Sequence, residues 1–120
     1  MNNENLKKRT KKFALDVIKF FEGLPKNETC RILGRQLLRS GTSVGANYRA
    51  ACRVKSTADF ISKMGTVEEE ADESAYWIEL LIEDGKVPEA KAAPLLKEAN
   101  ELVAITVSSI NTARKSGGRQ

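Results

Sequence analysis

Hydrophobic residues recur every three or four positions through most of the chain, the spacing that places them on one face of an α-helix. In the first such segment Leu6, Phe13 and Val17 mark the apolar face. The segment stops at Gly23 and Pro25, a pair typical of a helix end. The pattern therefore predicts a first helix that finishes before the proline.

A second segment keeps its apolar phase from Cys30 to Val54. It passes through Gly41 and Gly45 without a change of phase. Each glycine inside a helix costs about 1 kcal/mol relative to alanine, so we expect a weak or bent middle. We nevertheless predict one continuous helix over residues 27–55.

Two further helices are marked by their ends. Ser56, followed three residues later by Asp59, resembles a capping box at a helix start. Gly85 stands where a left-handed residue commonly closes a helix. The fourth helix opens at Pro88 or at Pro94, because proline is tolerated in a first turn.

Four long helices with short connections predict an all-α, up-down-up-down antiparallel four-helix bundle. A length of 120 residues suits a single domain. We assign residues 1–115 to this domain and residues 116–120 to a flexible C-terminal tail. The longest apolar runs are too short to span a membrane. Cys30 and Cys52 lie too far apart on one helix to pair, which favours reduced thiols and a cytoplasmic location.

The predicted core is not uniformly apolar. Ser40 and Asn47 fall on the inner flank of the second helix. A buried asparagine needs hydrogen-bond partners and can fix the register of a bundle. We therefore favour a structural role for Asn47 over contact with a ligand.

The second helix also carries a row of arginines. At about 100° per residue they fall at about 0°, 40°, 80°, 0° and 40°, while the apolar residues centre near about 220°. These residues are Arg31, Arg35, Arg39, Arg49 and Arg53. Guanidinium groups suit phosphate geometry, so the row is a candidate nucleic-acid-binding surface. The alternatives are a solvated face or a strip of ion pairs between subunits.

Charge is distributed unevenly along the chain. Residues 1–60 hold 13 basic and 5 acidic side chains, whereas residues 61–120 hold 7 basic and 11 acidic ones, within a net charge of +4. The N-terminal run Lys7-Lys8-Arg9-Thr10-Lys11-Lys12 adds to the basic half. Such asymmetry accompanies polyanion binding or self-assembly, although two packed halves can also neutralise each other.

The third helix has more apolar surface than one core face needs. Tyr76 and Leu80 point away from the predicted core, and Trp77 lies at its flank. Glu69 and Glu73 share this outward face. Because aromatic residues are favoured at interfaces, we expect these five residues to form a homo-oligomer interface, with a neighbour's arginines against the carboxylates. The alternative is a monomer with Trp77 at the edge of the bundle.

Catalytic chemistry finds little support in the sequence. Residues 41–45 match G-x-S-x-G, the serine hydrolase elbow, but that motif needs a strand before its serine. Here Ser43 lies inside a helical pattern, and the chain has no histidine for a triad. Two cysteines cannot form a closed zinc site. We therefore expect no enzyme activity, no metal and no cofactor.

Much of the chain resembles the four-helix-bundle family named for proteins encoded in intervening sequences of bacterial 23S rRNA genes. The residues that carry the resemblance are Gln36, Arg39, Ser43, Asn47, Ser56, Phe60 and the stretch 68–81. The accessory variability determinant of diversity-generating retroelements is similar to this family. The resemblance implies an up-down bundle that assembles as a homopentamer. It also implies binding of nucleic acid, with RNA favoured over DNA, and by analogy a protein partner such as a reverse transcriptase.

One departure from the family pattern makes the second helix more basic. Many members carry an acidic residue and a glycine shortly after the asparagine. Here Asn47 is followed by Tyr48, Arg49, Ala50 and Ala51. Two interpretations remain open. In the first, an oligomeric bundle binds nucleic acid through the arginine row. In the second, an assembly scaffold uses the arginines for intersubunit ion pairs and carries no nucleic acid.

Overall fold

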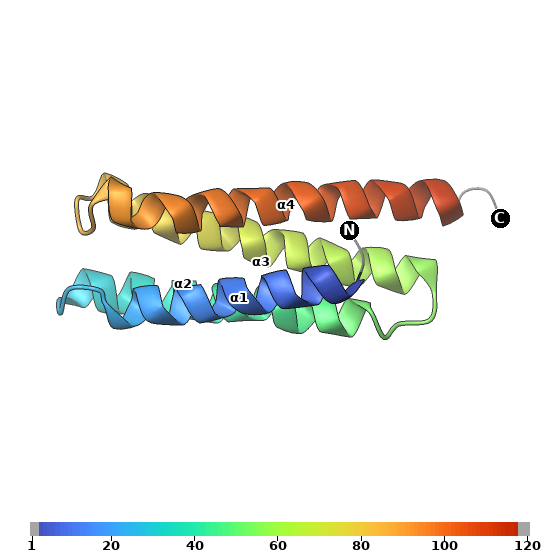
Figure 1. Ribbon diagram of the computed structural model, residues 1–120, viewed down its shortest axis with the longest axis horizontal. Helices are drawn as coiled ribbons and strands as arrows, with labels where there is room; N and C mark the ends of the chain where they lie inside the picture. Colours follow the sequence, from blue (N-terminus) through green and yellow to red (C-terminus); the bar gives the residue numbers. More distant parts are fainter. Residues whose placement is uncertain (1–2, 118–120) are drawn as a thin grey trace.

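The computed structural model describes residues 3–117, and all of their regular structure is helical. The helices are α1 (Asn3–Glu22), α2 (Glu28–Ala51), α3 (Thr57–Glu83) and α4 (Glu89–Gly117). They alternate in direction along a rod of 53 × 21 × 20 Å (Figure 1). The expected all-α fold with four helices is confirmed.

The core follows the predicted apolar faces, but the bundle is not closed equally on all sides. Phe13, Leu37, Ile78 and Leu102, one from each helix, are almost wholly buried. Helix α2 packs extensively on α1 and on α3, and α3 packs extensively on α4. Contact between α1 and α4 is far smaller. The fourth side of the bundle is therefore its loosest seam.

Side-chain caps and a glycine define the helix ends. The Ser56 hydroxyl accepts a hydrogen bond from the Asp59 backbone amide at 3.0 Å, as the sequence predicted. Gly85 has a φ of 73°, which suits a residue without a Cβ at the end of α3. Helix α4 begins directly after Pro88 and includes Pro94. The cap of α2 is Asn27, whose side chain accepts a hydrogen bond from the Cys30 amide at 2.9 Å.

Helix α2 is continuous through its glycines but shorter than expected. It ends at Ala51, so Arg53 lies beyond the helix and the predicted range 27–55 is too long. A Cβ on Gly41 would lie 2.8 Å from Cγ2 of Val17, closer than real Cβ contacts come. The glycines therefore allow close approach of α1.

Two buried hydroxyl groups join α2 to α3. The Oγ atoms of Ser40 and Ser74 lie 2.9 Å apart, and both residues are fully buried. Asn47 is only half-buried, and its Nδ2 donates to the backbone oxygen of Ser43 at 2.9 Å within the same helix. Asn47 is therefore less buried than expected, and the buried polar link between α2 and α3 is made by the serine pair.

The remaining sequence expectations concern the tail, the thiols and the membrane. Helix α4 extends to Gly117, two residues into the expected tail, and residues 118–120 lie outside the described part. Cys30 is buried and Cys52 half-buried, and neither is in a disulfide. Over residues 3–117, none of the helices has the length and apolarity that crossing a bilayer would require.

Candidate nucleic-acid interface

The outward side of the α1–α2 pair carries a set of unpaired basic side chains. Arg35 and Arg49 of α2 are exposed and form no ion pair with any described residue. Lys8 and Lys11 of α1 are likewise exposed and outside any ion pair with residues 3–117. A Cβ on Gly45 would meet Thr10 at 3.2 Å, so the N-terminal half of α1 lies beside the C-terminal half of α2. The lysines and Arg49 therefore share one end of this face.

Two of the five predicted arginines are already engaged within the chain. Arg31 donates to Glu28, with Nε to Oε1 at 3.1 Å. Arg39 donates to Glu70 at 3.0 Å and also to Glu73. On the helical wheel Arg39 stands about 80° from Arg31, which turns it toward α3. The row expected as one continuous cationic ridge is therefore interrupted.

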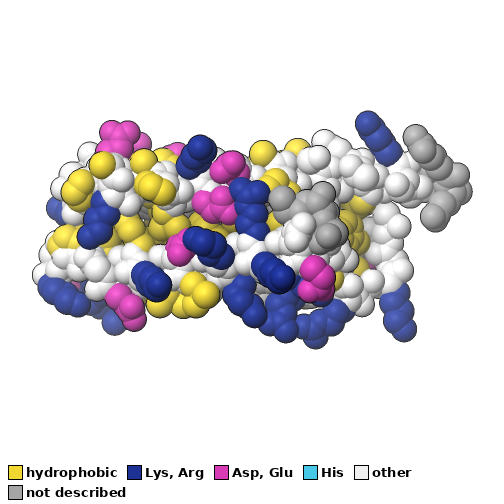
Figure 2. Space-filling model, viewed as in Figure 1, with side chains coloured by type: hydrophobic (Ala, Val, Ile, Leu, Met, Phe, Trp, Pro, Cys, Tyr) yellow, Lys and Arg dark blue, Asp and Glu magenta, His cyan; other side chains and the backbone are white. Residues whose placement is uncertain are grey.

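The fifth arginine does not belong to the helix. Arg53 is exposed in the connection after α2, beyond the capping residue Cys52. Arg9, part of the basic N-terminal run, points the other way and pairs with Glu98 of α4. Figure 2 shows two groups of basic side chains along the lower edge of the molecule, with hydrophobic side chains between them. The basic surface thus has two ends, which hydrophobic side chains separate.

The ion pair between Arg31 and Glu28 also changes the pKa of the carboxylate. The hydrogen bond from Arg31 lowers the pKa of Glu28 below its ordinary value, and the positive charge of Arg31 acts in the same direction. Glu28 is thus ionised at neutral pH and offsets Arg31. Less positive charge is available at the Arg31 end of the face than a count of arginines suggests.

The α2–α3 side presents the residues expected at a subunit interface. Tyr76 is 53% exposed, and its ring lies 5.2 Å from that of Trp77. Trp77 and Leu80 are half-buried, with Trp77 against the core. Glu69 is exposed, but Glu73 is already bonded to Arg39 of the same chain. Ile32 of α2, 49% exposed, adds an apolar side chain that the sequence interpretation had missed.

The structure also places three other residues that the sequence singled out. The indole Nε1 of Trp77 is buried and has no hydrogen-bond partner among the described residues. Phe60 is half-buried and packs against the core, as its place on the predicted apolar face implied. Gln36 is exposed on α2.

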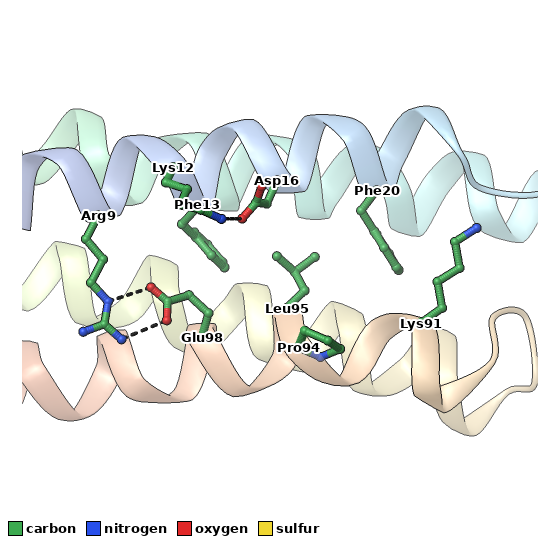
Figure 3. A pocket seen from close by; sticks show the side chains of 9 residues that line it. All are labelled: Arg9, Lys12, Phe13, Asp16, Phe20, Lys91, Pro94, Leu95 and Glu98. Atoms are coloured by element: carbon green, nitrogen blue, oxygen red, sulfur yellow. Dashed lines mark hydrogen bonds and ion pairs between the residues drawn. The ribbon is translucent and has the colours of Figure 1, made fainter.

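The loose seam between α1 and α4 contains a half-open pocket of about 530 Å³. Phe13, Phe20 and Leu95 line it with apolar groups (Figure 3). Arg9 of α1 spans the seam and donates two hydrogen bonds to the carboxylate of Glu98 on α4, at 2.7 and 2.8 Å. The hydrogen bond to Glu98 raises the pKa of Arg9, so this bridge is a permanently charged link across the seam.

The serine of the G-x-S-x-G match lies inside α2. The Ser43 hydroxyl donates to the backbone oxygen of Arg39 at 2.7 Å. Within residues 3–117 no three acidic or cysteine side chains gather as metal ligands would. The basic α1–α2 face is therefore the strongest candidate site that the described residues offer.

Comparisons with known proteins agree with this architecture. A family model described as 23S rRNA-intervening sequence protein matches residues 2–108. A crystal structure of a protein of unknown function from the S23 ribosomal protein family of Bacteroides thetaiotaomicron VPI-5482 is 32% identical, with a TM-score of 0.85. The match covers 92% of this chain and 99% of that one. Among curated proteins, no match was found.

Proposed function

Because the chain belongs to the 23S rRNA-intervening sequence protein family, we propose that it is a non-enzymatic helical bundle that binds structured RNA or another nucleic acid. The binding surface is the basic α1–α2 face. Phosphate contacts come from Arg35 and Arg49, with Lys8 and Lys11 beside Arg49.

One observation carries this proposal: these four cations are exposed and form no ion pair within residues 3–117, and the charge of Arg35 acts on a carboxylate only by lowering the pKa of Glu28 from a distance. An unpaired guanidinium group on the surface has no internal charge to release before it meets a phosphate. Arg39, by contrast, would have to leave Glu70 and Glu73. Arg39 therefore contributes less than its place in the row suggested.

A filter-binding titration of RNA across a range of salt concentrations tests the proposal. Arg35→Gln and Arg49→Gln each remove one phosphate contact, so each should weaken binding and reduce the slope of log K against log salt by about 1. The matched control is Arg39→Gln, which should leave the slope unchanged. Absence of binding at low salt, or equal loss in all three variants, contradicts the proposal.

We also propose that the chain self-assembles through the α2–α3 face. Tyr76 and Ile32 expose large apolar area there, and aromatic anchors favour interfaces. Family likeness supports a homopentamer. Light scattering of the purified protein tests this, and Tyr76→Ser should shift the mass toward the monomer. A monomer in the unaltered protein overturns the assembly proposal and leaves the binding proposal standing.

The second candidate function is an assembly scaffold without nucleic acid. The in-chain pairs of Arg39 with Glu70 and Glu73 favour it, since they show that arginines of α2 meet carboxylates. It predicts an ultraviolet absorbance ratio typical of protein alone after gentle purification, and an assembly that loosens at high salt.

By likeness to the retroelement accessory protein, we further propose a cytoplasmic role beside a partner such as a reverse transcriptase.

A further inference from the structure

We infer that the α1–α2 face selects double-helical nucleic acid over a single strand. This inference rests on the proposed function and narrows its ligand to one structural class. The chemistry that is recognised is a pair of phosphate rows separated by a groove, which duplex RNA and duplex DNA both present.

The first observation is the spacing of the two basic clusters. Arg35 and Arg49 lie 14 residues apart in one continuous helix, which separates their Cα atoms by about 21 Å. Arg35 marks the first cluster, and Arg49 with Lys8 and Lys11 of α1 marks the second.

The second observation is what lies between the clusters. Leu15 of α1 is 52% exposed, and Ile18 is half-buried on the same helix. On α2, Thr42 lies midway between Arg35 and Arg49, seven residues from each. Figure 2 shows this interruption as hydrophobic side chains between two groups of basic ones. An uncharged strip between two cationic clusters matches an uncharged groove between two phosphate rows.

The third observation is the absence of a stacking platform on this face. Among the described residues Tyr76 is the sole aromatic with an exposed side chain, and it belongs to α3. Helices α1 and α3 are not neighbours, since they lie diagonally across the bundle. Proteins that bind single strands combine a basic groove with aromatic rings on which bases stack. This face offers the charge without the rings.

The spacing is also fixed. Gly41 and Gly45 seat α2 directly against Val17 and Thr10 of α1, and adding a Cβ to Gly41 would collide with Val17. The two clusters, about 21 Å apart at the Cα atoms of Arg35 and Arg49, are thus held farther apart than adjacent phosphates, which follow each other at about 3.4 Å along each strand of a duplex. A duplex instead places phosphates on both sides of a groove, about 12 Å wide for the major groove of B-DNA.

Fluorescence anisotropy with labelled oligonucleotides tests this inference. The probes are an RNA duplex of about 20 base pairs, somewhat longer than the roughly 16 spanned by a double-stranded-RNA-binding domain, a DNA duplex of the same sequence, and each separate strand. We expect at least one duplex to bind about tenfold more tightly than its strands. The two duplexes show whether RNA or DNA supplies the phosphate rows.

Thr42→Arg, midway between Arg35 and Arg49, provides a second, independent measurement. The new cation would face the groove and not the phosphate rows, so duplex affinity should change less than about twofold, while Arg49→Gln weakens it several-fold. Single strands that bind as tightly as duplexes, or Thr42→Arg tightening duplex binding as much as Arg49→Gln weakens it, overturn the inference and leave nucleic-acid binding intact. No binding to any probe overturns the proposed function itself.

Discussion

Val17 packs directly on Gly41 at the contact between α1 and α2. A Cβ on Gly41 would lie 2.8 Å from one Val17 methyl carbon and 2.9 Å from the other. Val17 is fully buried, so it cannot swing away into solvent. The close approach of the two helices therefore depends on the missing side chain.

Gly41→Ala should destabilise the protein by about 1–3 kcal/mol, the usual cost of overpacking a core. Gly65 is the matched control, because a Cβ there would meet nothing within 4 Å. Gly65→Ala should stabilise by up to about 1 kcal/mol through helix propensity alone. Urea unfolding followed by circular dichroism measures both. A stabilised Gly41→Ala variant would contradict the close packing described for α1 and α2.

The buried serine pair should show strong energetic coupling. Each hydroxyl also bonds within its own helix, Ser40 to the Leu37 oxygen at 3.3 Å and Ser74 to the Glu70 oxygen at 2.8 Å. Either single change to alanine should cost about 0.5–1.5 kcal/mol. The double change should cost less than the sum, since the one hydrogen bond between the two serines is counted in both single changes but is lost only once. A double-mutant cycle from urea unfolding tests this, and strictly additive costs would refute it.

Tyr48 should make the fold sensitive to alkali. Burial, assisted by a hydrogen bond with Cys52, raises its pKa above the ordinary value of about 10. The folded state thus favours the neutral phenol. Its contribution to stability is complete below about pH 10 and is lost as pH rises toward the pKa of the folded state.

The free energy of unfolding should therefore fall more steeply above about pH 10 in the unaltered protein than in Tyr48→Phe. Tyr76→Phe is the control, since that ring is exposed. Urea unfolding midpoints of the three proteins, measured at several alkaline pH values, test this prediction. Parallel pH profiles for the unaltered protein and Tyr48→Phe would exclude a role for this phenol.

The ion pair across the loose seam should hold α1 to α4. Arg9 and Glu98 are 28% and 27% exposed at their side chains, so solvent weakens their attraction. Glu98→Gln should cost at most about 1 kcal/mol. Hydrogen exchange of α1 amides should nevertheless accelerate, because few other contacts join these helices. Lys12→Gln is the control, since Lys12 pairs with Asp16 inside α1. Equal acceleration in both variants would argue against a role of the Arg9–Glu98 ion pair in holding α1 to α4.

The periodicity of the sequence was sufficient to predict the helices but not all their ends. Ser56 and Gly85 were recognised because caps and left-handed residues act locally. The end of α2 at Ala51 was missed, since the apolar phase runs on to Val54 and no glycine or proline interrupts it. The end is fixed by the reversal into α3, which a single segment cannot reveal.

The candidate site was predicted less completely for the same reason. The direction of an arginine follows from its position on the helix, but its partner depends on how two helices are aligned. Arg39 reaches Glu70 and Glu73, 31 and 34 residues away in the chain. Arg35 and Arg49 have no such partner among residues 3–117. Distinguishing engaged from available cations required the three-dimensional structure.

The uneven distribution of charge along the sequence becomes a charge difference between two sides of the folded molecule. Residues 1–56, which hold α1 and α2, carry 13 basic and 4 acidic side chains, and residues 57–120, which hold α3 and α4, carry 7 basic and 12 acidic ones. The two pairs form opposite long sides of the rod (Figure 1). The molecule is therefore an electric dipole perpendicular to its length, and the field of an approaching polyanion would turn it broadside, positive flank first, before any side chain touched.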